Sequence, residues 1–222
     1  MKRSIQDNWA SRLVSYAMNL FLTSFYFLVL NIPIVILHLL VTLNNEAIPG
    51  LLLTYICFLP LGPAFAAVLS MAINILTKGE LEDITKRFFR FYKENFKQAI
   101  IIWSLSLLAM MILYVDVKYT SSKLKPIFYI LLGYVFIIAN YALLYVSKFY
   151  LKLKYILRLA YMSTFKYGFT SMAMLGIFII LGFLAYKLVY IGIMLFTSAY
   201  AFGLVCYCKK PIKEISEIIR RE

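Results

Sequence analysis

The chain has 222 residues, of which 63% are hydrophobic and only 15% charged, with 23 basic and 10 acidic residues. A soluble domain carries roughly 25% charged residues, so the composition excludes an ordinary water-soluble domain. Three cysteines (Cys57, Cys206 and Cys208) are too few, and too apolar in their setting, for a disulfide framework, and we expect free thiols.

Apolar runs near the ~20 residues that cross a bilayer predict an all-α fold, a polytopic transmembrane bundle with one domain over 1–222. The first run contains "NIP" at Asn31–Pro33 and exceeds one crossing, so we expect a tilted helix or one kinked near the proline. The sequence predicts six membrane spans. The alternative is five spans, with one very long last helix. The predicted spans are about 13–43, 51–76, 98–115, 126–147, 170–186 and 188–207.

The second predicted span contains "FLPLGPAFAAVLS". Pro60, Gly62 and Pro63 are expected to break or bend this helix within the membrane, and the small residues that follow allow close helix packing. Backbone groups freed at the break, together with Asn74 and Asn140, are candidates for lining a solute path, as in discontinuous transporter helices. A packing kink and interhelical hydrogen bonds are the alternative interpretation.

The segment "TKGELEDITKRFFRFYKENFKQAI" at 77–100 gathers charges and aromatic rings. From Leu81 to Phe96 the apolar positions recur at helical steps and the basic residues fall largely on the other faces, which predicts an amphipathic cytoplasmic helix at the membrane surface. The acids of "ELED" suit the start of this helix. A second segment, "LAYMSTFK" at 159–166, repeats the Y-x-x-x-F-K pattern. The candidate interfacial or docking residues are Phe88, Phe89, Arg90, Phe91, Tyr92, Lys93, Asn95, Phe96 and Lys97.

The positions of the basic residues favour a cell-membrane protein with both termini in the cytoplasm. Three basic residues precede the first span, six lie at 78–97, five at 148–167 and five after Cys208, which leaves four for the outer side. The basic excess then faces the anionic inner leaflet of the bilayer. This distribution explains the charge without nucleic acid, which we exclude as a partner.

Motifs that would indicate an enzyme do not occur in the sequence. There is no G-x-x-x-x-G-K-[ST] phosphate loop, no H-E-x-x-H and no G-x-S-x-G, and the chain has a single histidine. In the predicted topology no ionisable residue lies at mid-membrane, where a proton relay would need one. We therefore expect no catalytic residues, no cofactor and no metal site.

The stretch Leu61–Ile100 resembles the YesL family of small bacterial membrane proteins. It carries a Gly-Pro followed by small residues (Gly62-Pro63-Ala64), a Gly-Glu pair (Gly79-Glu80) and a run similar to F-F-x-x-F/Y-K-x-N-F-K-Q. The residues that match this run are Phe88, Phe89, Tyr92, Lys93, Asn95, Phe96, Lys97 and Gln98.

The resemblance implies an accessory role in carbohydrate uptake, because members of the family often accompany ABC-type sugar permeases. The leading hypothesis is thus an accessory or assembly subunit associated with carbohydrate ABC-type uptake. A stand-alone small-solute transporter and a membrane-embedded sensor or regulator of sugar utilisation stay open as alternatives. The expected partners are the anionic inner leaflet and ABC sugar permease subunits, and the sequence is compatible with a homo-oligomer.

Overall fold

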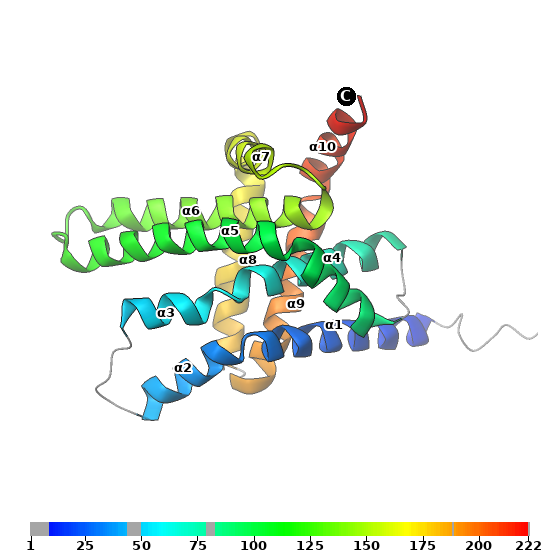
Figure 1. The fold of residues 1–222 in the computed structure, drawn as a ribbon, viewed down its shortest axis with the longest axis horizontal. Coiled ribbons are helices and arrows are strands. Elements are labelled where there is room, and N and C mark those ends of the chain that lie inside the picture. The colour runs from blue at the N-terminus through cyan, green and yellow to red at the C-terminus, as the bar shows by residue number, and fades with distance from the viewer. Residues whose placement is uncertain (1–8, 44–49, 79–82, 188, 222) are drawn as a thin grey trace, which may run out of the picture.

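The computed structural model describes residues 9–43, 50–78, 83–187 and 189–221, and this part of the chain is helical without strands (Figure 1). Residues 44–49 and 79–82, the second of which includes the Gly79-Glu80 pair, lie outside the described residues. The helices are α1 (Trp9–Leu30), α2 (Ile32–Leu43), α3 (Leu51–Phe58), α4 (Leu61–Lys78), α5 (Ile84–Tyr119), α6 (Lys125–Lys148), α7 (Leu153–Lys166), α8 (Gly168–Lys187), α9 (Val189–Tyr207) and α10 (Lys209–Arg221).

The first apolar run forms two helices, α1 and α2, with a bend of 66° between them. Pro33 explains the bend, because proline has no N–H to donate and its ring clashes with the preceding turn of a helix. At the bend the Asn31 side-chain amide donates to the Phe27 carbonyl oxygen at 2.8 Å. The predicted kink near the proline is confirmed, in the form of a sharp break.

The second apolar run is divided at Leu59 and Pro60 into α3 and α4, which together extend over one candidate span, Leu51–Thr77. Gly62 and Pro63 lie in the first turn of α4. A proline is tolerated there because the N–H it lacks would have no intrahelical partner. The interruption therefore starts a new helix and does not distort an existing one.

Helix α5 is continuous over 36 residues, a length of about 54 Å, whereas the hydrocarbon layer is about 30 Å thick. The predicted surface helix and the predicted third span therefore belong to one helix, because no glycine or proline interrupts Ile84–Tyr119. The helix begins later than the predicted Leu81. Asp83 precedes it in the left-handed conformation, with φ of 52°, which a short polar side chain tolerates.

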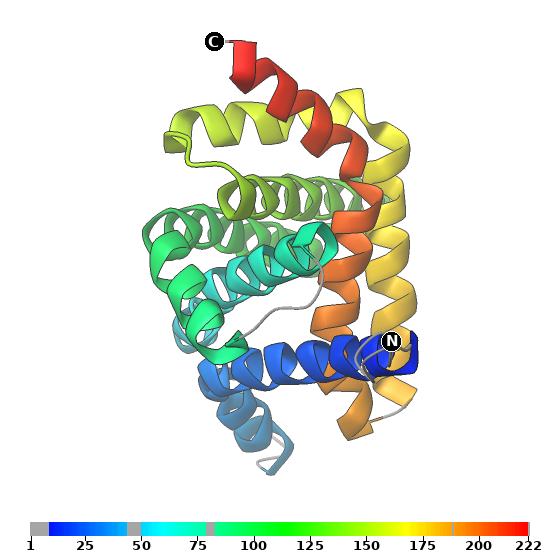
Figure 2. The same cartoon turned by 90° about the vertical axis from the view of Figure 1, so that its right-hand side faces the viewer.

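Helices α8 and α9 run side by side and cross the other long helices (Figures 1 and 2). The pair is turned away from α7 by a bend of 95° at Tyr167. Small polar residues let α9 approach α1 closely: Ser198 and Ser24 share a hydrogen bond of 2.6 Å, and Ser198 donates to the Leu20 carbonyl at 3.1 Å. The last apolar region is thus two helices and not one very long helix.

Among the described residues, three stretches are long and apolar enough to cross a membrane unaided: Leu51–Thr77, α5 and α6. The bent pairs α1–α2 and α7–α8 raise the number to five if each counts as one span. The described apolar part of α9, Phe196–Tyr207, is shorter than a crossing. The structure thus supports a multi-helix membrane protein, while the count of six spans stays a prediction.

Helix α4 lies at the centre of the hydrophobic core, where Ala64, Ala66, Ala67 and Ala72 have no exposed surface. Their small side chains bring the backbone of α4 close to its neighbours, as small residues do in membrane helices. The core also takes in the second half of α6, including Tyr141 and Tyr145. The helices that carry the candidate site therefore pack against a fully buried centre.

Candidate functional site: the basic end of helix α5

The first turns of α5 carry an exposed row of cations, Lys86, Arg90, Lys93 and Lys97, which we call the basic face. The side chain of Lys86 is 83% exposed and that of Arg90 is 60% exposed. Two of these cations have weak partners within the helix, since Lys86 lies 3.4 Å from Asp83 and Arg90 lies 3.8 Å from Glu94. Ion pairs this exposed contribute little to stability, so the face is available for a partner.

The opposite side of the same turns is buried, and it includes two of the predicted docking residues, Phe88 and Asn95. Phe88 has no exposed surface and its ring centroid lies 5.5 Å from that of Tyr26 on α1. Tyr26 also shares a hydrogen bond of 2.6 Å with Thr85. The structure therefore places Phe88 inside the protein and uses it to fix the start of α5 against α1.

The remaining aromatic residues of the segment lie between these two sides. Phe91 and Tyr92 are half-buried, and Phe89 and Phe96 are exposed at the edge of the basic face. The Tyr92 and Phe96 rings meet edge to face at 5.5 Å, a favourable geometry for an aromatic pair. The exposed part of the segment thus combines two phenylalanines with four cations.

Asn95 connects α5 to α4 and α6 through buried polar contacts. Its amide donates to the Ser70 hydroxyl at 2.9 Å, and Ser70 donates to the Ser147 carbonyl at 3.2 Å. Ser147 in turn donates to the Ala66 carbonyl at 2.9 Å. Because buried polar groups must be satisfied, these contacts fix the three helices relative to one another below the basic face.

The break between α3 and α4 is covered by Trp103 of α5. The indole N–H donates to the Phe58 carbonyl oxygen at 2.8 Å. A Cβ built on Gly62 would lie 2.2 Å from the Trp103 Cβ, so glycine is needed for this approach. Sequence reasoning overlooked Trp103, although a tryptophan within a predicted span indicates a nearby acceptor for its N–H.

The two asparagines proposed for a solute path are engaged in hydrogen bonds. The Asn74 amide donates to the Ser70 carbonyl at 2.9 Å. The Asn140 amide donates to the Phe136 carbonyl at 2.8 Å, while its oxygen accepts from the Tyr200 hydroxyl at 3.1 Å. Gly62, Asn74 and Asn140 line neither of the two grooves at the first turns of α5.

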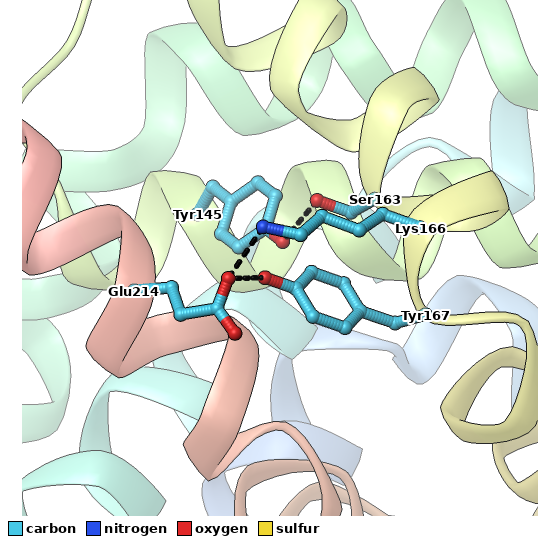
Figure 3. Close-up of polar contacts among 5 residues, drawn as sticks. All are labelled: Tyr145, Ser163, Lys166, Tyr167 and Glu214. Carbon is cyan, nitrogen blue, oxygen red and sulfur yellow. Dashed lines mark hydrogen bonds and ion pairs between the residues drawn. The ribbon is translucent and has the colours of Figure 1, made fainter.

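Helices α7 and α10 are joined through Glu214 (Figure 3). One carboxylate oxygen accepts from the Lys166 ammonium at 2.5 Å and from the Tyr167 hydroxyl at 2.6 Å. These two donors, the lysine first, hold the pKa of Glu214 below its ordinary value. On the other side of α7, the Tyr145 hydroxyl of α6 donates to Ser163 at 2.7 Å, so α7 is fixed at both faces.

These observations define the class of the protein: an all-helical chain with three to five candidate membrane spans and a basic, partly aromatic face on one long helix. Residues 20–117 match the model of a family described as protein of unknown function, DUF624. The matched stretch contains the bend between α1 and α2, the junction of α3 and α4, and the basic face. No curated protein and no solved structure matches the chain.

Proposed function

We propose that the protein is an integral membrane subunit that docks a partner protein on the basic face, and that the partner is the permease of a carbohydrate ABC importer. The choice of partner rests on the YesL-like resemblance of Leu61–Ile100. In the proposed topology the chain crosses the cell membrane six times with both termini in the cytoplasm, which puts the basic face on the cytoplasmic side, where such a permease also presents its loops.

The observation that carries the docking proposal is the asymmetry of the first turns of α5. Phe88 and Asn95 anchor one side in the core, which leaves Arg90, Lys93 and the edge residue Phe96 facing outward. Exposed aromatic and arginine side chains are enriched in protein interfaces. A simple lipid anchor would not need the buried polar contacts beneath it.

The transport alternative requires a path near Gly62, Asn74 and Asn140. Trp103 lies directly against Gly62, and both asparagine amides are bonded to carbonyl groups of their own helices. Sites formed by broken helices leave backbone groups free to bind a solute, whereas here the Phe58 carbonyl is taken by Trp103. These contacts favour docking over transport.

The test is purification of the protein from its native host in a mild detergent, with mass spectrometry of the proteins that co-purify. The variant Arg90→Gln/Lys93→Gln removes two charges from the basic face and touches no buried group. Lys118→Gln/Lys123→Gln is the matched control, because it removes two exposed charges from the other end of the same helix and the loop that follows it.

We expect permease subunits to co-purify in near-equal amount with the wild type and with the control. With Arg90→Gln/Lys93→Gln, present in the membrane at the wild-type level, the amount of co-purified permease should fall at least fivefold. Phe89→Ala/Phe96→Ala should give the same loss. Recovery of the wild-type protein alone would overturn the choice of partner. Undiminished co-purification with both variants would overturn the assignment of the surface.

A further inference from the structure

A groove of about 420 Å³ lies beside the basic face, where the loop from α6 to α7 passes over α5. Its walls come from one turn of α5, the end of α6 and the loop residues 149–152. The Gln98 amide donates to the Leu151 carbonyl at 2.9 Å, so the loop is attached to α5 along one side. By helical position Gln98 is opposite Phe89, and the groove is therefore separate from the aromatic edge of the docking surface.

The groove has two cations that are not neutralised. Lys97 and Lys152 line it, are exposed, and meet no carboxylate among the described residues. The one acidic residue in the wall, Glu94, already accepts from the Tyr150 hydroxyl at 3.2 Å and lies near Arg90. The free charge in the groove is therefore positive and favours an anion.

The start of α7 adds to this preference. Lys152 precedes the first turn of α7, and no side chain caps that end of the helix. The first N–H groups of a helix have no intrahelical partner and carry partial positive charge. The partial positive charge at this end of α7 lies next to Lys152, which lines the groove, and positive charge at a helix start suits phosphate oxygens.

Apolar side chains form the rest of the wall. Val146 belongs to the last turns of α6, a candidate span, and is buried, while Phe149 and Leu151 continue the apolar surface in the loop. A free phosphate ion would gain nothing from these residues. A lipid would place its phosphate among the cations and its chains along the ends of α5 and α6, as lipids do in basic pockets between membrane helices.

We propose that this groove binds an anionic phospholipid, with the phosphodiester group between Lys97 and Lys152. The proposal does not depend on the docking function. The lipid site shares Lys97 with the basic face and adds Lys152 from the loop before α7.

The experiment titrates detergent-purified protein with phosphatidylglycerol or phosphatidylcholine and counts bound lipid by native mass spectrometry. Each lost charge near a lipid phosphate should weaken binding about fivefold, so Lys97→Gln/Lys152→Gln should raise the apparent Kd for phosphatidylglycerol about 25-fold. Lys118→Gln/Lys123→Gln is the control, and Lys97→Arg/Lys152→Arg should retain binding because the charges remain.

Each other outcome overturns the proposal in a distinct way. Equal affinity of the Lys97→Gln/Lys152→Gln variant and the control would place the lipid elsewhere. Equal binding of phosphatidylcholine would mean that net charge is not recognised. Displacement of phosphatidylglycerol by an equal concentration of inorganic phosphate would show a phosphate site that makes no use of the apolar wall.

Discussion

The contact between Gly62 and Trp103 leads to a quantitative expectation for Gly62→Ala. The new Cβ would lie 2.2 Å from the Trp103 Cβ and 2.4 Å from its Cγ, atoms that cannot move without the backbone of α5. Overpacking costs about 1–3 kcal/mol, and loss of the bond from Trp103 to Phe58 adds about 1 kcal/mol. The better helix propensity of alanine returns about 1 kcal/mol.

The expected net destabilisation is about 2 kcal/mol, which in a chain of this length lowers Tm by about 4–8 °C. Differential scanning fluorimetry of the detergent-purified protein measures this, and in a Trp9→Phe background the emission maximum of Trp103 should also shift. Gly176→Ala is the control, because its added Cβ meets nothing within 4 Å. A Tm for Gly62→Ala equal to that of the control would refute the reasoning.

Two further changes test contacts around the candidate site. Asn95→Ala removes the buried donor to the Ser70 hydroxyl and should lower the free energy of unfolding by about 1–3 kcal/mol, which thermal unfolding measures. If the losses of Asn95→Ala and Ser70→Ala simply add in the double variant, the two residues do not interact. Glu214→Gln should lower Tm at neutral pH. Because the pKa of Glu214 is held below its ordinary value of 4.5, the stabilising effect is complete above pH 4.5 and is lost as pH falls through the lower pKa of the folded protein. The Tm difference between the wild type and Glu214→Gln should therefore vanish in acid, and a difference that does not depend on pH would show that the contact to Lys166 is not electrostatic.

Features that depend on neighbouring residues were predictable from the sequence. Composition and run length predicted a helical membrane protein, and Pro33 and Pro60 marked helix breaks, because proline acts on the turn that contains it. The cations of the basic face were also predictable from their spacing. Their exposure follows from the cost of burying an unpaired charge.

Features that depend on distant partners were not predictable in this way. The pattern that placed Phe88 on an aromatic face does not reveal that Tyr26 of another helix covers it. Asn95 finds Ser70, and Trp103 finds Phe58, only after α4 and α5 have packed together. The crossing of α8 and α9 follows from the bend at Tyr167 and from contacts such as Ser24 with Ser198, and neither has a signal in apolar periodicity.

The continuity of α5 has a mechanical consequence. Arg90 and Trp103 are on one helix with no glycine or proline between them, about 20 Å apart along its axis. The helix is unbroken, but its first turns bend away from the rest (Figures 1 and 2), so the basic face and Trp103 lie on differently directed parts of one helix. A displacement of the first turns would act on the rest of α5 through this bend, and there Trp103 lies against Gly62 and donates to the Phe58 carbonyl oxygen. A load on the basic end of α5 and the geometry of the junction between α3 and α4 are then coupled.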